Sequence, residues 1–275
     1  MNTHALGYQP SPIDDNDYKL VGDANSLFGA NFGVAAPPKH YENIRHIDFI
    51  RDQSITNSCV WQAMLQQHWI AQGVQGTSPR KKLSVLYGYW NTRKRTGFEK
   101  ADRGCLPREA WKAAAAMGFP EEKMWPFDPG NVNAKPDFDA IAAAIDQRWV
   151  KGYYNIYGMQ GRKLEVMQAI SQGHPVVLGT VIDSAFDKFR GGVHDTLGIP
   201  TGFIGRHMMC AVAYDEEGLW VVNSWGENWG SPDPTGKFKG GFFRMSWEWL
   251  NWFQVTDLWA VTYAKEFSVC HAFSV

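Results

Sequence analysis

Four residues of the types used in thiol chemistry occur in the order Gln53, Cys59, His207, Asn223. Cys59 opens the run 60–70, which holds helix-forming residues and neither glycine nor proline. We therefore expect the thiol at a helix N-terminus, where the helix dipole favours the thiolate. A histidine beside it can take the thiol proton and later return it to a leaving amine. These residue types point to acyl transfer through a covalent intermediate.

The other two residues suit supporting roles in the same chemistry. Asn223 begins the block Asn-Ser-Trp-Gly, and its side-chain carbonyl can fix the orientation of the His207 ring. A tetrahedral intermediate also needs hydrogen-bond donors for its oxyanion. The side-chain amide of Gln53 and the backbone N–H of Cys59 are a sufficient pair.

At these residues the chain resembles the papain-like cysteine peptidases, over roughly residues 40–265. The resemblance implies that Gln53 is the oxyanion-hole glutamine, Cys59 the nucleophile, His207 the general base and Asn223 the ring-orienting asparagine. It also places Trp225 over the histidine–asparagine contact, as a shield from water. Further segments similar to family motifs follow in the same order: Gly173–Leu178, Phe186–Val193 and Gly240–Met245.

The pattern around the nucleophile departs from the usual family reading Q-G-x-C-G-S-C-W. Ser54 and Asn57 stand where that pattern has glycine, Thr56 where it has a disulfide cysteine, and Val60 where it has tryptophan. The form here is similar to the disulfide-free members from bacteria and their phages. The N-terminal stretch 6–18 also resembles the leading segment of that group.

The predicted fold class is α+β, with the two-lobed papain-like architecture that the resemblance implies. We expect an N-terminal extension over 1–45, a helical lobe over 46–150, an antiparallel β lobe over 151–265 and a tail over 266–275. Periodicity predicts helices at the Cys59 run, 84–92, 107–117, 137–147 and 164–172, and strands at 176–182, 208–214, 219–223 and 241–245. The nucleophile and the base would then face each other across a cleft.

Several residues are expected to contact substrate in that cleft. The resemblance puts Gly104 and Cys105 in a loop that pairs with the substrate backbone, and Gly179 and Met208 around a pocket beside the histidine. A small Gly179 and a flexible Met208 would suit a bulky apolar side chain. Trp225 completes the predicted set.

Composition is that of a packed globular protein, with 44% hydrophobic and 20% charged residues in 275. The net charge of −1 gives no global field for nucleic acid, and no apolar run reaches the ~20 residues of a membrane span. The four cysteines are too scattered for a disulfide framework or a metal site. We expect a cytoplasmic, reducing location, because no signal sequence is present, and no cofactor; the partner is a peptide or protein substrate.

Three alternatives stay open. A related amidase or transglutaminase would use the same residue order. A structural component, for example of a phage particle, would fit the altered residues near Cys59 and the 13 tryptophans. An inhibited enzyme would have its own N-terminal extension over the cleft. We also expect the extension and a tryptophan-rich segment to serve as docking surfaces, for self-association or for a larger assembly; the segment contains Trp247, Trp249, Trp252 and Trp259.

Overall fold

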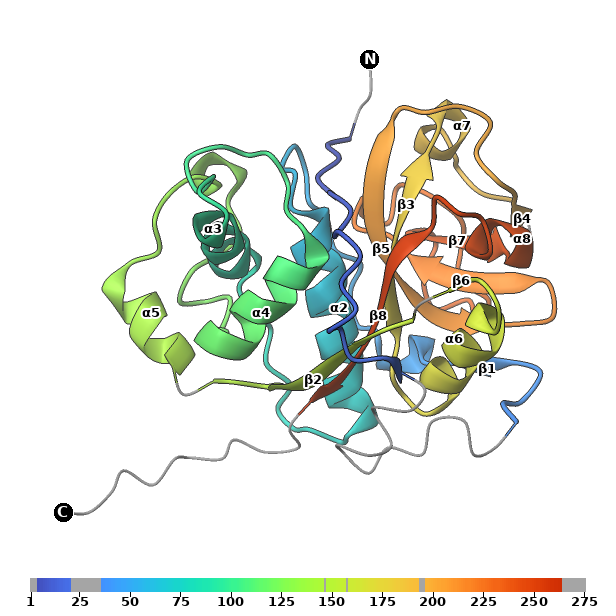
Figure 1. Cartoon of the computed structure of the whole chain (residues 1–275), viewed down its shortest axis with the longest axis horizontal. Coiled ribbons are helices and arrows are strands. Elements are labelled where there is room, and N and C mark those ends of the chain that lie inside the picture. Colours follow the sequence, from blue (N-terminus) through green and yellow to red (C-terminus); the bar gives the residue numbers. More distant parts are fainter. Residues whose placement is uncertain (1–3, 21–35, 146, 157, 193–195, 264–275) are drawn as a thin grey trace.

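Helices and sheet occupy opposite sides of the molecule. The computed structural model describes residues 4–20, 36–145, 147–156, 158–192 and 196–263. One group of helices gathers on one side, and most strands lie on the other side with several shorter helices beside them; the N-terminal segment runs between the two sides (Figure 1). The helical side contains α2 (Cys59–Val74), α3 (Val85–Arg95), α4 (Pro107–Met117), the short η2 (Pro129–Asn131) and α5 (Phe138–Ile145).

The strands of the described residues form one sheet in the order β2-β8-β3-β5-β6-β7-β4, with β1 paired to β5. All pairs are antiparallel except β4 with β7. The α+β class predicted from the sequence is therefore confirmed. The strands are β1 (Tyr41–Glu42), β2 (Val150–Asn155), β3 (Val176–Ile182), β4 (Thr196–Leu197), β5 (Gly205–Tyr214), β6 (Gly218–Val222), β7 (Phe242–Ser246) and β8 (Thr256–Tyr263). Four short helices accompany them: η1 (Ile44–His46), α6 (Arg162–Ser171), α7 (Ser184–Asp187) and α8 (Trp247–Leu250).

Helix α2 lies at the junction of the two sides and is buried around nearly its whole circumference. Thirteen of its sixteen residues are buried, and it packs against β5, β3 and α3. Gln67 binds the helix to the sheet, since its side-chain amide donates to the carbonyl oxygens of Pro175 and Trp259. The nucleophile candidate at the start of α2 is thereby fixed relative to both sides.

Most predicted elements agree with the structure, and four strands were missed, of which β1 and β4 have only two residues each. Helix α4 and strand β3 have the predicted bounds, and Ser84 caps α3 by accepting a hydrogen bond from the Tyr87 amide. Strands β2 and β8 were not predicted, although they pair with each other along their length. The predicted boundary near residue 150 falls at the start of β2, and the end of the predicted extension holds β1. The predicted tail 266–275 lies outside the described residues.

The tryptophan-rich segment contributes mainly to the core. Trp249 and Trp259 are fully buried, and the Trp249 indole donates to the hydroxyl of Thr180. Trp247 and Trp252 are partly buried and pack against the same core. The expectation that Trp249 and Trp259 form a docking surface is therefore wrong, because both rings are buried and neither can contact a partner.

Glycine at position 88 permits close packing of α3 on α2. A Cβ placed on Gly88 would lie 2.3 Å from the ring of Trp61. We predict that Gly88→Ala lowers the free energy of unfolding by about 1–3 kcal/mol, because overpacking outweighs the gain of roughly 1 kcal/mol in helix propensity. Thermal unfolding measures this. Gly198→Ala is the control, since a Cβ there meets nothing within 4 Å; equal midpoints for both variants would contradict the packing argument.

Candidate active site

Cys59 is the first residue of α2 and is completely buried. The turn before it is held by Thr56, whose hydroxyl donates to the carbonyl oxygen of Gln53 and lies 2.7 Å from the hydroxyl of Ser58. These bonds stabilise the turn at the position where the family pattern has a disulfide cysteine. The backbone amide of Met208, the neighbour of His207 in β5, lies close enough to the Cys59 sulfur to lower the pKa of the thiol. The structure therefore brings the predicted nucleophile to the strand that carries the predicted base.

His207 and Asn223 are in direct contact. His207 Nε2 lies 2.7 Å from Asn223 Oδ1, an oxygen that also accepts from the Ser224 amide. Since Asn223 Oδ1 is an acceptor, the proton of a neutral His207 ring belongs on Nε2. Nδ1 is buried and has no hydrogen-bond partner among the described residues. It is thus an unprotonated base. The Trp225 ring stacks on His207 with centroids 4.7 Å apart.

Gln53 is oriented by the same loop that carries Asn223. Its side-chain oxygen accepts from the Ser224 hydroxyl at 2.7 Å, which directs the amide nitrogen away from that loop. This nitrogen donates to the carbonyl oxygens of Thr56 and of Ala5. The side-chain amide of Gln53, predicted to stabilise the oxyanion, therefore already donates to a peptide carbonyl of the chain itself, that of Ala5.

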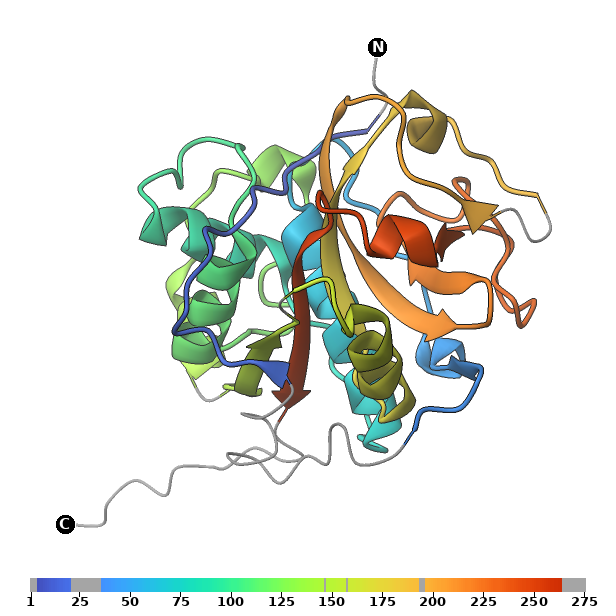
Figure 2. The same cartoon turned by 45° about the vertical axis from the view of Figure 1, so that its right-hand side comes forward.

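Residues 4–12, here called the cleft segment, run between the helical side and the sheet (Figures 1 and 2). The segment passes beside the thiol, because the Gly7 amide lies close enough to the Cys59 sulfur to lower the pKa of the thiol. The Gly7 carbonyl accepts from the Cys105 amide at 2.9 Å, and Gln9 donates to the Cys105 carbonyl. Gly104 has φ +78°, and a Cβ there would lie 1.9 Å from the Gly7 carbonyl oxygen. Of the two residues predicted to pair with substrate, Cys105 thus pairs with the cleft segment, and Gly104 lies close against it.

The side chains of the cleft segment fill positions on both sides of the thiol. Tyr8 covers Gly179, where a Cβ would lie 2.2 Å from its ring. At the other end His4 stacks on Trp225 with ring centroids 4.2 Å apart, and its Nδ1 lies 3.0 Å from a carboxylate oxygen of Asp187. Met208 is buried and pairs with Gly179 in the β3–β5 register. The remaining predicted substrate residues are therefore part of the same cleft.

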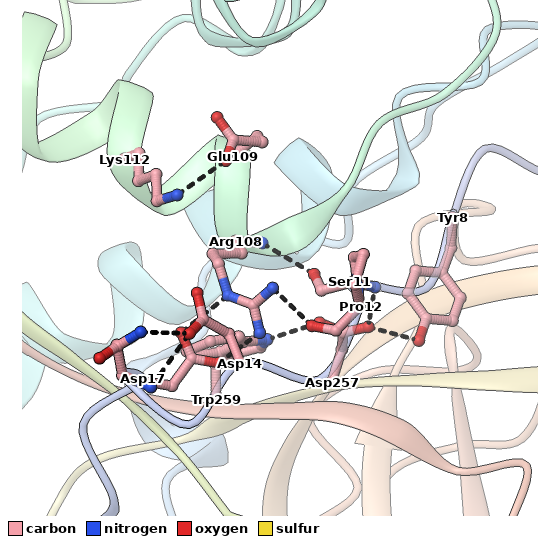
Figure 3. A network of polar contacts seen from close by, with 11 residues as sticks. Tyr8, Ser11, Pro12, Asp14, Asp17, Arg108, Glu109, Lys112, Asp257 and Trp259 are labelled. Carbon is pink, nitrogen blue, oxygen red and sulfur yellow. Dashed lines mark hydrogen bonds and ion pairs between the residues drawn. The ribbon is translucent and has the colours of Figure 1, made fainter. Parts of the chain in front are cut away.

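A polar network attaches the far end of the cleft segment and the residues after it to α4 and β8 (Figure 3). Arg108 forms a two-point ion pair with Asp17, with Nε at 2.7 Å from Oδ1, and donates to the Pro12 carbonyl. Both charged side chains are more than nine-tenths buried. The Ser11 amide donates to Asp257, and the Ser11 hydroxyl accepts from the Arg108 amide. An ion pair of this geometry is costly to break on one side only, because the remaining charge stays buried.

Burial decides the protonation of the catalytic candidates. It raises the pKa of the Cys59 thiol to about 11, against the opposing effect of hydrogen bonds from the Met208 and Gly7 amides. Burial also lowers the pKa of His207 to about 4, although the Asn223 contact acts in the other direction. Both groups are therefore neutral at neutral pH. The thiolate expected from a helix N-terminus does not form while the cleft segment is in place.

Two departures from the family pattern have structural explanations. Ser54, at a glycine position of that pattern, has φ +51° and is stabilised by a hydrogen bond from its amide to Asp52. The side chain of Asn57 donates to the Asp102 carbonyl and leaves its backbone to contact the cleft segment. A Cβ on Gly7 would lie only 1.8 Å from the Asn57 carbonyl oxygen. Asn57 thus leaves room for a backbone but for no side chain at residue 7.

Sequence reasoning missed three polar residues of the site, Ser224, Arg108 and Asp257. Ser224 could have been found, because it adjoins Asn223 in the recognised block. Arg108 and Asp257 have no local signal, since their partners are distant in sequence; Asp257 and Tyr8 are separated by 249 positions. In the described part of the chain, no group of three or more metal-ligating side chains occurs and no helix could span a membrane.

The geometry describes a buried thiol, a neutral imidazole and amide donors, a set suited to acyl transfer. The family model for papain family cysteine protease matches residues 94–255, more than half of the chain. The chain belongs to the papain family of cysteine proteases, which are thiol hydrolases. The matched stretch includes His207 and Asn223, and Cys59 precedes it.

Solved structures agree on the fold. Xylellain, a cysteine protease from Xylella fastidiosa, matches with a TM-score of 0.76 and 22% identity, over 96% of this chain and 97% of that one. The Carica candamarcensis cysteine protease CMS1MS2 matches with a TM-score of 0.62 and 19% identity, over 82% and 98%. Procathepsin B S9 from Trypanosoma congolense matches with a TM-score of 0.66 and 13% identity, over 96% and 87%.

One curated relative matches over a short stretch. Gamete and mating-type specific protein A of Dictyostelium discoideum is 29% identical over 79 residues, or 28% of this chain. The match covers 17% of that protein's length. It therefore adds little to the family assignment.

The raised pKa of Cys59 leads to a prediction for thiol reactivity. In the folded full-length protein, alkylation of Cys59 should be slow at neutral pH and accelerate as pH rises toward about 11, because only the thiolate reacts. Mass mapping of the labelled peptide over a pH series measures this. Cys210, whose pKa burial raises further, serves as the internal comparison. Rapid labelling of Cys59 at neutral pH would contradict the described protonation state.

Proposed function

We propose that this protein is a cysteine peptidase whose N-terminal segment keeps it latent. The observation that carries the proposal is the hydrogen bond from the Gln53 side-chain amide to the Ala5 carbonyl, beside which the Gly7 amide lies close enough to the Cys59 thiol to lower its pKa. The two groups proposed to attack and stabilise a substrate carbonyl are thus both engaged by one stretch of backbone. A peptide is therefore the ligand that this cleft accepts.

The proposed reaction begins when the cleft segment leaves. His207 Nδ1 takes the thiol proton, and the Cys59 sulfur attacks the peptide carbonyl carbon. Gln53 Nε2 and the Cys59 amide stabilise the oxyanion. The intermediate collapses to a thioester as the departing amine receives the proton from His207. Water, deprotonated by the same ring, then releases the acid and restores the thiol.

Asn223 and Trp225 act on the ring rather than on the substrate. Asn223 Oδ1 holds the Nε2–H tautomer, which leaves Nδ1 as the base. Trp225 excludes water from this contact because its ring stacks on His207. Each turnover moves a proton onto and off the His207 imidazole. A fixed ring orientation keeps the distance of this proton transfer short.

The direction of the cleft segment explains why it is not cut. The leaving amine must reach His207, so the leaving part of a substrate extends toward Trp225, which flanks that ring. The acyl part then extends toward the pocket of Tyr8. A substrate would run from that pocket to Trp225, whereas the cleft segment runs from His4 on Trp225 to Tyr8. It therefore presents an amide N–H to the sulfur in place of a carbonyl carbon.

Removal of the cleft segment should activate the enzyme. Gly7→Ala introduces a Cβ that would clash with the Asn57 carbonyl at 1.8 Å, and residue 7 has no positive φ that would strain alanine. We predict that a thiol-directed peptide probe labels Cys59 at least about 10-fold faster in this full-length variant, and that the variant cleaves peptides faster. A loss of about 1.4 kcal/mol in the binding of the cleft segment gives that factor. Asp15→Ala, an exposed change in the same region, is the control. Unchanged labelling in Gly7→Ala would refute latency.

The catalytic roles are tested in the Gly7→Ala background. Gln53→Ala should lower kcat by roughly 10²–10³ with little change in KM, the usual loss of one oxyanion donor. Cys59→Ala should abolish cleavage. A change in KM alone would mean that Gln53 binds substrate, and activity without Cys59 would end the proposal. Preference for an isopeptide substrate would favour the amidase or transglutaminase alternative. A Gly7→Ala protein that is folded but inactive would favour the alternative of a structural component.

A further inference from the structure

The pocket that Tyr8 fills ends in a carboxylate. The Tyr8 ring lies against Gly179, and its hydroxyl donates to Asp257 Oδ2 at 2.8 Å and contacts the hydroxyl of Thr256. Figure 3 shows Asp257 and the Tyr8 hydroxyl facing each other beneath the cleft segment. The sequence predicted a pocket for a bulky apolar side chain. Its occupant instead has an apolar body and a polar end, and the pocket matches both.

The backbone at Asp257 is built to aim this carboxylate inward. The β3–β8 register shifts between Val177 and Gly179, so β8 bulges opposite the pocket. Within the bulge Asp257 has φ +51°, a left-handed conformation that few residues other than glycine adopt. Bulges redirect side chains, and strained backbone is found at functional sites. The carboxylate is 7% exposed, although it lies at the end of a strand beside the cleft.

Asp257 receives two of its three described side-chain hydrogen bonds from the cleft segment. Oδ2 accepts from the Tyr8 hydroxyl and from the Ser11 amide, both of which belong to that segment. Oδ1 accepts from the Trp259 indole, which belongs to the body of the protein. The guanidinium of Arg108 contacts Asp17 and the Pro12 carbonyl, and that of Arg206 donates to Gln254. When the cleft segment leaves, Oδ2 loses two donors in a confined pocket.

We propose that Asp257 is a specificity-determining residue that selects a basic side chain, arginine or lysine, on the acyl side of the cut. This inference rests on the proposed peptidase function. A long stem can lie over Gly179 as the Tyr8 ring does, and a cationic end replaces the donors that Oδ2 has lost. A tyrosine is accepted next best, while leucine leaves Oδ2 of the buried carboxylate without a donor, which is costly.

The first test treats Tyr8 as a tethered ligand and needs no peptidase activity. Full-length Tyr8→Phe and Tyr8→Lys are made with Asp257 and with Asp257→Asn, because asparagine tolerates the left-handed conformation. Alkylation of Cys59 reports opening of the cleft, and thermal unfolding confirms that each variant is folded. We expect Tyr8→Lys to stay slow with Asp257 and to label about 10- to 100-fold faster with Asp257→Asn, the factor for a charged hydrogen bond. Tyr8→Phe should be fast in both.

The second test uses Gly7→Ala protein and a peptide library in which each acyl-side position is arginine, tyrosine or leucine. At one position arginine should exceed leucine by about 10- to 100-fold in kcat/KM, and Asp257→Asn should bring that ratio near one. Glu248→Gln, which removes an exposed charge elsewhere, is the matched control.

The two proposals fail in different ways. If no peptide is cut, the peptidase function fails, while the Tyr8 variants still decide what the pocket recognises. If peptides are cut but leucine equals arginine with and without Asp257→Asn, or if Tyr8→Lys opens the cleft as readily as Tyr8→Phe, Asp257 does not select a basic side chain.

Discussion

The approach of the Gly7 backbone to the start of α2 is the contact on which the state of the whole site depends. The Gly7 amide lies beside the thiol, its carbonyl accepts from the Cys105 amide, and no Cβ fits between Gly7 and Asn57. This contact places Ala5 on the side-chain amide of Gln53 and Tyr8 over Gly179. One stretch of backbone therefore contacts the proposed nucleophile, the proposed oxyanion donor and the loop expected to pair with substrate. Ion pairing of Arg108 with Asp17 then fixes the far end.

Coverage of the site also sets its protonation. A helix N-terminus and a nearby imidazole both favour a thiolate, but each acts on a group that is fully buried. Desolvation is the larger effect, and it favours the neutral thiol and the neutral imidazole. The proposed latency thus has two physical components, because the cleft segment would exclude substrate and also keep the Cys59 thiol protonated. Its departure admits water, which removes the desolvation that opposes the ion pair.

The sequence predicted the parts of the site that depend on local pattern. The Cys59 helix follows from an uninterrupted run of helix formers, and the His207–Asn223 contact from a recognisable block. The turn at Ser54 and the β8 bulge at Asp257 were not predictable, because both use left-handed residues other than glycine. Strand β8 was missed for the same reason, since the bulge interrupts its alternation. The cleft segment is irregular, and its contacts reach residues 48 to 249 positions away. From the sequence, coverage of the cleft by the N-terminal extension was therefore only one of several alternatives.

The cleft segment and a substrate are proposed to compete for the Cys59 thiol, the Gln53 side-chain amide and the Cys105 backbone. Amide hydrogen exchange tests this competition most directly. The amides of Gln9 and Cys105, which bond across the cleft, are followed in the full-length protein before and after a thiol-directed peptide probe is attached to Cys59. The account predicts that the Gln9 amide is protected in the free protein and exchanges rapidly once the probe is bound, whereas the Cys105 amide stays protected because the probe backbone replaces Gly7. If Cys59 carries the probe while the Gln9 amide keeps its full protection, the two do not compete and the account is contradicted.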